Sequence, residues 1–189
     1  GVVGIITGRT AGTRAIGLRA DIDALPMQEL NTFEHASQHA GKMHGCGHDG
    51  HTAMLLNAAR YLAENKSFDG TVYAIFQPAE EGLSEETHDE DPHIGARAMV
   101  DAGVLDNPKV DAVFGLHLLP SFPVGTLAYR SGPILASGDT FKIQVTGKQT
   151  HGGFPWNGVD SLVGTDQVGI GHTTIVSRQG NIAKGPSIY

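Results

Sequence analysis

Short apolar segments typical of β-strands alternate along this chain with a segment that has helical spacing. Residues 2–7 and 15–20 are apolar or β-branched and are separated by glycines and polar residues, which predicts a hairpin. Residues 51–65 carry apolar side chains at helical spacing. Residues 71–77 are rich in β-forming residues and run into Pro78. Strands that alternate with helices predict an α/β fold with a layered core.

The second half of the chain has weaker patterns. The segment from 95 to 102 has a weak helical pattern, residues 111–118 are typical of a buried strand, and a further strand is expected at 125–130. Residues 140–146 alternate apolar and polar side chains, which predicts a half-buried strand. A glycine-containing helix is expected over 159–177. We expect a second domain to begin near Gly138. Residues 21–50 have no periodicity, which predicts a long loop or a broken helix, and long loops tend to be functional.

Charge and cysteine content exclude several classes of function. The 189 residues include 13 basic and 20 acidic side chains, for a net charge of −7, and contain no basic block. We therefore expect no nucleic-acid partner. Cys46 is the single cysteine, so no disulfide can form within the chain, and a reducing, cytoplasmic location is favoured. No apolar run approaches the roughly 20 residues of a membrane span, so no membrane partner is expected.

Residues 44–51, with the sequence His-Gly-Cys-Gly-His-Asp-Gly-His, are the densest group of potential metal ligands in the chain. The interleaved glycines let several side chains turn toward one point. A thiolate combined with imidazoles suits zinc or a neighbouring transition metal. The segment also leads into the predicted helix, whose dipole is expected to lower the pKa of the Cys46 thiol. The alternative is a chance grouping in a glycine-rich turn.

Two consecutive glutamates, Glu80 and Glu81, follow the strand predicted at residues 71–77. Adjacent side chains of an extended chain point in opposite directions, so one carboxylate can face a metal ion and the other a water molecule. Burial of two carboxylates costs several kcal/mol unless a cation compensates them. Taken alone, the pair is also consistent with a solvated turn. Beside residues 44–51, it indicates a metal site with a general base.

Two further histidines lie near the ends of predicted strands. His117 lies near the carboxyl end of the strand predicted at 111–118, and His151 follows the strand predicted at 140–146 and precedes two glycines. A single histidine in such a place is usually a hydrogen-bonded core residue. However, loops that follow successive strands of an α/β sheet converge on one edge, where sites form. His117 is therefore a candidate for the same site, whereas His151 alone is uninformative.

Several segments together resemble a known family. They are LRADIDALPMQE (18–29), HASQHAGKMHGCGHDGHTAMLL (35–56), IFQPAEEG (75–82), GARAM (95–99), DAVFGLH (111–117), PVGTLAYRSGPILAS (123–137) and the segment around His151. In this order they resemble the co-catalytic zinc metallopeptidases, a family that includes hippurate hydrolase, aminoacylase-type N-acyl-amino-acid amidohydrolases and plant indoleacetyl-amino-acid hydrolases. The resemblance covers most of the chain.

The resemblance implies a ligand set and a reaction. Two divalent metal ions (Zn, Mn, Co or Ni) would be bound by Cys46, His48, Glu81 and His117. Glu80 would be the general base, Asp21 or Asp23 and Asp49 would give acidic support, and His151 would stabilise the oxyanion from the partner subunit of a homodimer. The implied substrate is a small molecule, an N-acyl or N-aroyl amino acid, which is hydrolysed to a carboxylic acid and a free amino acid.

The resemblance also implies a division of the chain. Residues 1–137 would form part of a catalytic domain, a mixed sheet flanked by helices, and residues 138–189 the truncated start of a smaller α+β dimerisation domain. The family has a fifth metal-binding histidine further along, so we expect a fragment, and residues 84–94 would be an acidic insertion. Two alternatives stay open, a catalytically silent metal-binding fragment and a calcium- or partner-binding module at residues 85–91, which lacks EF-hand spacing.

Overall fold

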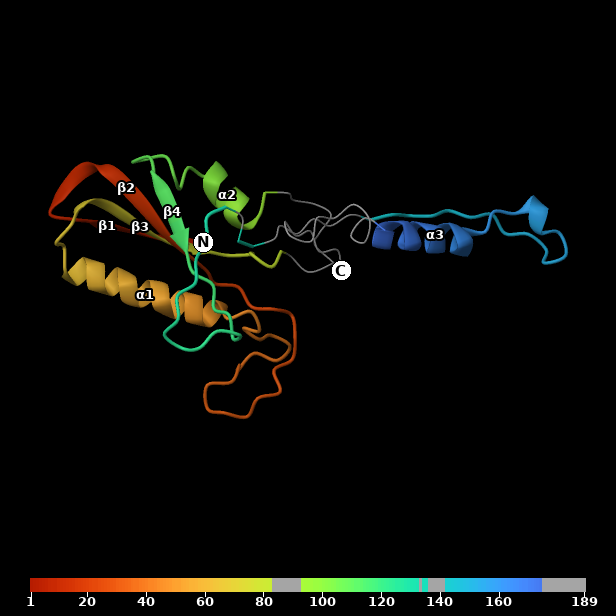
Figure 1. Ribbon diagram of the computed structural model, residues 1–189, viewed down its shortest axis with the longest axis horizontal. Helices are drawn as coiled ribbons and strands as arrows, with labels where there is room; N and C mark the ends of the chain where they lie inside the picture. The colour runs from red at the N-terminus through yellow and green to blue at the C-terminus, as the bar shows by residue number, and fades with distance from the viewer. Residues whose placement is uncertain (83–92, 133, 136–141, 175–189) are drawn as a thin grey trace. The chain divides into compact units, whose positions relative to one another are not determined.

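The computed structural model describes residues 1–82, 93–132, 134–135 and 142–174 (Figure 1). The chain divides into two compact units, Gly1–Pro123 and Val124–Tyr189. The domain boundary predicted near Gly138 and most of the predicted acidic insertion lie outside the described residues, so both stay predictions.

The first unit is built on a four-stranded mixed sheet with the strand order β1-β3-β2-β4. The strands are β1 (Val2–Thr7), β2 (Thr10–Asp21), β3 (Asp69–Gln77) and β4 (Ala112–Gly115). β1 runs antiparallel to β3, whereas β2 runs parallel to both β3 and β4. The carboxyl ends of β2, β3 and β4 therefore lie at the same edge of the sheet. The segments that follow these three ends carry most of the predicted site residues.

The predicted hairpin between the first two strands is wrong, because β3 lies between them. Tyr73 of β3 pairs with Ile5 of β1 on one side and with Gly17 of β2 on the other. The central position gives the backbone of β3 hydrogen-bond partners on both sides, which a buried strand requires. Local sequence pattern located these strands correctly, but it carries no information on which strands pair.

The side chains of β3 contribute to both layers of the core. The helices of this unit are α1 (His48–Glu64) and α2 (Gly95–Asp101). Tyr73 and Ile75 belong to a cluster that includes Met99 of α2, whereas Ala74 packs with Leu55 of α1. Successive strand side chains point to opposite faces, so the two helices cover opposite faces of the sheet (Figure 1). The predicted α/β fold with a layered core is confirmed.

Helix α1 begins earlier than the spacing of its apolar residues indicates. Its first residue is His48, directly after Gly47, which has a φ of 87° in the left-handed region that favours glycine. His48 and His51 both lie in the first turn, and because residues three apart share a face of a helix, both are buried with Leu55. The start of the helix thus directs two imidazoles from residues 44–51 inward.

Residues 22–47 form the predicted long loop, which is closed at its base. Leu25 and Met43 exchange both backbone hydrogen bonds, at 2.9 and 3.1 Å. Farther out, the Glu29 carboxylate accepts hydrogen bonds from the Ser37 backbone N–H at 2.6 Å and from the Asn31 side-chain amide at 2.9 Å. The closed base returns the chain to the end of β2, which brings Cys46 to the edge of the sheet.

The second unit contains the 3₁₀ turn η1 (Pro155–Asn157) and the helix α3 (Ser161–Thr174). The side chain of Asp160 caps α3 by accepting the N–H groups of Leu162 and Val163 at 2.9 and 3.2 Å. The predicted helix is thus confirmed over 161–174. The strands predicted at 125–130 and 140–146 are not formed by residues 125–130 or 142–146, which pair with no strand in the described part of the chain; residues 140 and 141 lie outside it. Among the described helices, none is long and apolar enough to cross a membrane.

Candidate metal centre

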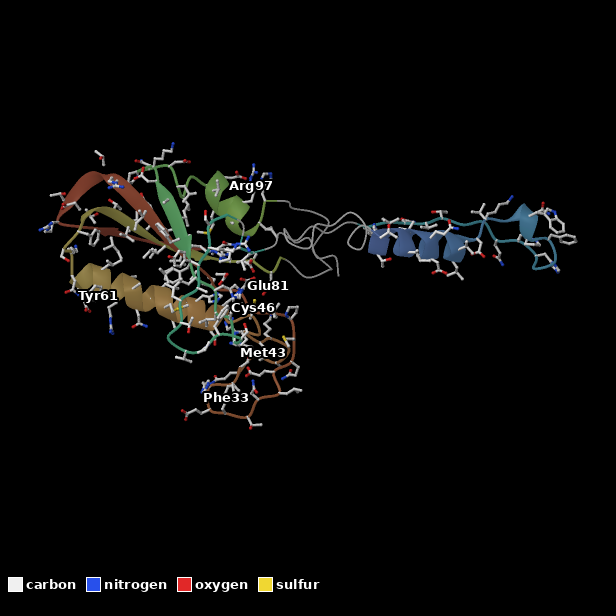
Figure 2. The ribbon with its side chains drawn as sticks, in the orientation of Figure 1. Phe33, Met43, Cys46, Tyr61, Glu81 and Arg97 are labelled. Carbon is white, nitrogen blue, oxygen red and sulfur yellow. The ribbon has the colours of Figure 1, made fainter. Side chains whose placement is uncertain are left out.

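Three chain segments at the carboxyl edge of the sheet bring the four predicted metal ligands together. One ligand atom from each of Cys46, His48 and Glu81 can be chosen so that all three lie within 4.8 Å of one another. Nε2 of His48 lies 3.7 Å from Oε1 of Glu81. Sγ of Cys46 lies 3.6 Å from Nε2 of His117. Figure 2 shows Cys46 and Glu81 at the end of the sheet near the start of α1.

His48 has the orientation that a metal-binding histidine requires. Its side chain is 1% exposed, and its Nδ1 donates to the carbonyl oxygen of Asp23 at 2.9 Å. Because the proton is on Nδ1, Nε2 presents a lone pair. Of the buried side-chain nitrogen and oxygen atoms in the described residues, only this Nε2 has no hydrogen-bond partner. An unpaired buried acceptor costs about 1–3 kcal/mol, so the site fits a cation at this atom.

His117 presents its ring to the site in the same way. Its Nδ1 donates to the carbonyl oxygen of Leu118 at 2.8 Å, so its Nε2 carries the lone pair that faces Cys46. The ring also meets the ring of His51 edge-on, with a centroid distance of 4.7 Å. Both predicted imidazole ligands are therefore held at Nδ1 by a backbone carbonyl and present Nε2 to the same region.

Negative charge surrounds the thiol of Cys46. Burial raises its pKa, and a hydrogen bond to Glu81 and the charges of Glu81 and Glu80 raise it further, to about 11. The predicted lowering of the Cys46 pKa is therefore wrong for the metal-free protein. Burial and the carboxylates raise the pKa by more than the dipole of α1 can lower it. The same charge would favour a bound cation, and binding of a metal to the sulfur would require loss of the thiol proton.

Glu80 and Glu81 both reach His48. Oε2 of Glu80 and Oε1 of Glu81 lie 3.8 and 3.7 Å from Nε2 of His48. The expectation that the two side chains point in opposite directions does not hold, because the chain bends here instead of staying extended. Ala79, directly before them, has a φ of 48°, a conformation that alanine rarely adopts. This turn is what brings both carboxylates to one imidazole.

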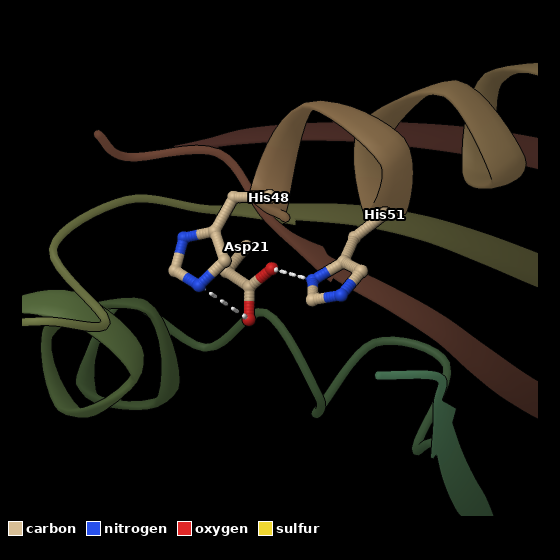
Figure 3. Close-up of side chains that lie close together, drawn as sticks. All are labelled: Asp21, His48 and His51. Atoms are coloured by element: carbon tan, nitrogen blue, oxygen red, sulfur yellow. Dashed lines mark hydrogen bonds and ion pairs between the residues drawn. The ribbon is translucent and has the colours of Figure 1, made fainter. Parts of the chain in front are cut away.

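Asp21 and Asp23 both support the site, whereas Asp49 is exposed. Figure 3 shows Asp21 between His48 and His51. Its Oδ1 lies 2.6 Å from Nδ1 of His51, and its side chain is 2% exposed. Burial acts to raise the pKa of Asp21, but the hydrogen bond from His51 and the charge of Arg19 outweigh it, so the pKa is lowered. Asp21 is therefore a buried anion beneath the predicted ligands.

The sequence does not reveal the part that His51 plays. The residue is 2% exposed, and its two ring nitrogens contact Asp21 and the backbone N–H of Leu118. One ligand atom from each of Asp21, His48 and His51 also lies within 4.8 Å of the others. The available signal was the spacing of three residues between His48 and His51, which places both on one face of a helix.

His151 belongs to the second unit and is exposed. Its Nδ1 accepts the backbone N–H of Gly153 at 2.9 Å, which places the ring proton on Nε2. The ring lies beside Phe154, at a centroid distance of 5.5 Å. Its role as a donor to an oxyanion stays a prediction.

Comparison with known proteins identifies the family. Residues 17–175 match the sequence profile of peptidase family M20/M25/M40. The chain belongs to this family. It is 44% identical over 182 residues to N-acetyl-L-cysteine deacetylase of Bacillus subtilis, an alignment that covers 96% of this chain and 41% of that protein. It is 39% identical over 178 residues to hippurate hydrolase of Campylobacter jejuni, covering 94% and 43% of the two chains.

A plant relative and two solved structures agree with this assignment. IAA-amino acid hydrolase ILR1-like 2 of Arabidopsis thaliana is 44% identical over 180 residues, which cover 95% of this M20/M25/M40 chain and 38% of the relative. A Bacillus subtilis structure described as a dinuclear metal-binding M20 peptidase is 44% identical, with a TM-score of 0.60 over 69% of this chain and 33% of that one. A Staphylococcus aureus structure assigned as an aminohydrolase is 37% identical, with a TM-score of 0.72 over 94% and 44%.

These comparisons confirm the family resemblance and the mixed α/β fold that the sequence predicts. The M20/M25/M40 chain spans about two fifths of the length of the curated relatives it matches.

Proposed function

We propose that this protein hydrolyses the amide bond of N-acyl or N-aroyl amino acids in a metal-dependent reaction, which releases a carboxylic acid and a free amino acid. The observation that carries the proposal is the convergence of Cys46, His48, Glu81 and His117 beside Glu80, a carboxylate outside the ligand set. The names of the relatives support the substrate class, since they include N-acetyl-L-cysteine deacetylase, hippurate hydrolase and IAA-amino acid hydrolase.

The four ligands would hold two divalent ions, Zn, Mn, Co or Ni. Their thiolate, imidazole and carboxylate groups suit these metals. His48 and His117 supply Nε2 atoms fixed by backbone carbonyls, and Glu81 supplies a carboxylate oxygen close to His48. When bound, such ions polarise a carbonyl and lower the pKa of water.

Glu80 is the proposed general base. Its side chain is 41% exposed, so water and substrate can reach it, while its Oε2 stays 3.8 Å from Nε2 of His48. The carboxylate takes a proton from the attacking water as the new C–O bond forms. It then returns this proton to the amide nitrogen as the C–N bond breaks. The amide and water are thereby converted to a carboxylic acid and an amine.

We further propose that the protein is a cytoplasmic homodimer in which His151 acts on the substrate bound by the second copy. Its Nε2 proton is available for an oxyanion because Nδ1 accepts the Gly153 N–H. A donor of this kind is worth about 2.7–4 kcal/mol in other enzymes. The cytoplasmic assignment is supported by Cys46, the single cysteine, which must stay reduced to bind metal.

The decisive experiment compares wild type with Glu80→Gln in metal content and in hydrolysis of hippurate and N-acetylcysteine. We expect equal metal content and a loss of turnover of about 10²–10⁴-fold, because the substitution removes the proton acceptor. Glu64→Gln, the same change at an exposed residue at the end of α1, is the control and should leave both unchanged.

Each other outcome has its own meaning. Hydrolysis that survives Glu80→Gln removes Glu80 from the reaction. A wild-type chain that binds metal but hydrolyses no N-acyl amino acid favours the catalytically silent metal-binding function. A wild-type chain that binds no metal overturns both functions.

A further inference from the structure

His51 takes no part in the proposed ligation or proton transfer, yet it is one of the most buried polar residues described. It is 2% exposed and lies in the first turn of α1, on the same face as His48. Its Nδ1 lies 2.6 Å from Oδ1 of Asp21. A dashed line in Figure 3 marks this interaction. Nε2 of His51 accepts the backbone N–H of Leu118 at 2.9 Å. The ring thus joins the end of β2 to the segment that follows β4.

These two contacts fix the position of the ring proton. Because the Leu118 N–H donates to Nε2, that nitrogen is unprotonated, and the proton lies on Nδ1, where it is donated to the Asp21 carboxylate. Both ring nitrogens of His51 therefore make hydrogen bonds within the protein. His51 is not available to a cation, and the group of Asp21, His48 and His51 is explained by hydrogen bonding.

Leu118 is held between two imidazoles. Its N–H donates to His51, and its carbonyl oxygen accepts from Nδ1 of His117 at 2.8 Å. The rings of His51 and His117 are also in edge contact, at 4.7 Å between centroids. These contacts with Leu118 and His51 set the orientation of the His117 ring, in which its Nε2 lies 3.6 Å from Sγ of Cys46.

The side chain of Leu118 lies against the same turn of α1. A Cβ atom placed on Gly50 would lie 2.3 Å from Cδ1 of Leu118, and one placed on Gly47 would lie 3.4 Å from its Cβ. His117 itself is exposed, and residues 116–119 have no regular secondary structure. The contact between Leu118 and the start of α1 is therefore a direct restraint on the position of His117.

Asp21 is anchored in turn by neighbouring strands. Its Oδ2 accepts a hydrogen bond from Nη1 of Arg19 at 2.8 Å, and Nε of Arg19 donates to Oε1 of Gln77 at 2.8 Å. Gln77 is the last residue of β3. A continuous series of hydrogen bonds thus runs from β3 through β2 and α1 to the residue after His117, which gives His51 a rigid support.

We propose that His51 is a positioning residue, which is held by Asp21 and fixes the Leu118 backbone so that His117 faces Cys46. This inference rests on the proposed function and deepens it, because it assigns a residue that assembles the metal centre without binding metal. Loss of a group that orients a metal ligand typically lowers metal affinity by about 10–100-fold.

The test compares wild type with His51→Leu and His51→Gln in titrations with Co²⁺, with the thiolate-to-cobalt absorption band as the readout. Leucine removes both hydrogen bonds at similar volume, whereas glutamine retains a donor and an acceptor. We expect His51→Leu to weaken Co²⁺ binding by about 10–100-fold and His51→Gln to recover much of the loss. His39→Leu, a change at an exposed histidine of the loop 22–47 outside residues 44–51, should match wild type.

A folded His51→Leu chain that binds Co²⁺ with wild-type affinity overturns the inference, and so does a His51→Gln chain no better than His51→Leu. A wild-type chain that binds no Co²⁺ overturns the proposed function instead. If His51→Leu does not fold or wild type binds no metal, nitrogen NMR of wild type labelled with ¹⁵N decides. Protonated Nδ1 and a scalar coupling between the Leu118 N–H and Nε2 support the inference, and protonated Nε2 overturns it.

Discussion

Asp23 holds His48 and Glu81 at the same time. Its carbonyl oxygen and Oδ1 lie 2.9 and 3.2 Å from Nδ1 of His48, and its Oδ2 accepts the backbone N–H of Glu81 at 3.0 Å. His48 and Glu81 lie on different elements, at the start of α1 and after β3. One aspartate after β2 therefore helps to set the distance between two proposed ligands.

Replacement of Asp23 should weaken metal binding without a direct change to any ligand. Asp23→Ala leaves the Glu81 N–H without its acceptor and removes one of the two oxygen atoms near Nδ1 of His48. We expect the affinity for Zn²⁺, measured by titration calorimetry, to fall by about 10–100-fold. Asp69→Ala is the control, because Asp69 is an exposed residue that contacts Thr10 and Arg9 at the other end of β3. Equal affinities in the two variants would contradict the prediction.

Acid should destabilise the first unit through Asp21. The folded state lowers the pKa of this carboxyl below its ordinary value of 3.8, so its contribution to stability is present above that pH and is lost as the pH falls through the folded-state pKa. Removal of one partner of a buried ion pair costs about 3–5 kcal/mol, and we expect Asp21→Asn to lie at the lower end at pH 7, because Arg19 is 27% exposed.

Urea unfolding at a series of pH values measures this effect. The difference in the free energy of unfolding between wild type and Asp21→Asn should shrink below about pH 3.8. Asp69→Asn removes the same charge from an exposed position and serves as the control. A difference that stays constant from pH 7 to pH 3 would show that the charge of Asp21 does not stabilise the fold.

The parts of the fold that depend on local pattern could be predicted from the sequence. The helical spacing of residues 51–65 and the β-forming residues 71–77 located α1 and β3, because side-chain periodicity follows from the geometry of each element. The residues predicted as ligands also lie at one end of the sheet, as expected. The strands that precede them are β2, β3 and β4, and both β3 and β4 run parallel to β2. Pairing was not predictable, because the insertion of β3 between β1 and β2 depends on contacts distant in sequence.

The grouping of the proposed ligands was predictable from the sequence, whereas the electrostatics of the site were not. The density of donors in residues 44–51 indicated Cys46 and His48, whereas the raised pKa of Cys46 depends on burial in the assembled fold and on carboxylates from β2 and from the segment after β3. The orientation of Glu80 and Glu81 depends on the unusual φ of Ala79, which no pattern indicates. The role of His51 depends on hydrogen bonds to Asp21 and to the Leu118 backbone. Both partners are distant from His51 in the sequence, so the role could be inferred only from the folded structure.

Alkylation of Cys46 should be slow at neutral pH when metal is removed by a chelator. A thiol with a pKa of about 11, instead of the ordinary 9.0, has about one hundredth of the thiolate at pH 8, and thiolate is the reactive form. The rate with iodoacetamide should rise with pH toward a midpoint near 11. Glu81→Gln should lower this midpoint because it removes a hydrogen bond and a charge that favour the thiol, whereas Glu64→Gln should not. A midpoint near 9 in wild type would contradict the prediction.

Substitution of Gly95 should disturb the turn that carries Glu80. Gly95 has a φ of 57°, and a Cβ atom placed there would lie 2.6 Å from the carbonyl oxygen of Ala79. Alanine at a left-handed backbone position costs roughly 1–2 kcal/mol. Gly95→Ala therefore carries this cost and, in addition, a clash between its Cβ atom and the Ala79 backbone. Gly41→Ala is the matched control, because Gly41 has a φ of 71° but open space around it, so it carries the conformational cost alone. We expect Gly95→Ala to lose clearly more unfolding free energy in urea than Gly41→Ala, and also to bind Zn²⁺ more weakly, since Ala79 directly precedes Glu80. Equal losses of stability in the two variants would show that the turn at Ala79 yields to the added methyl group.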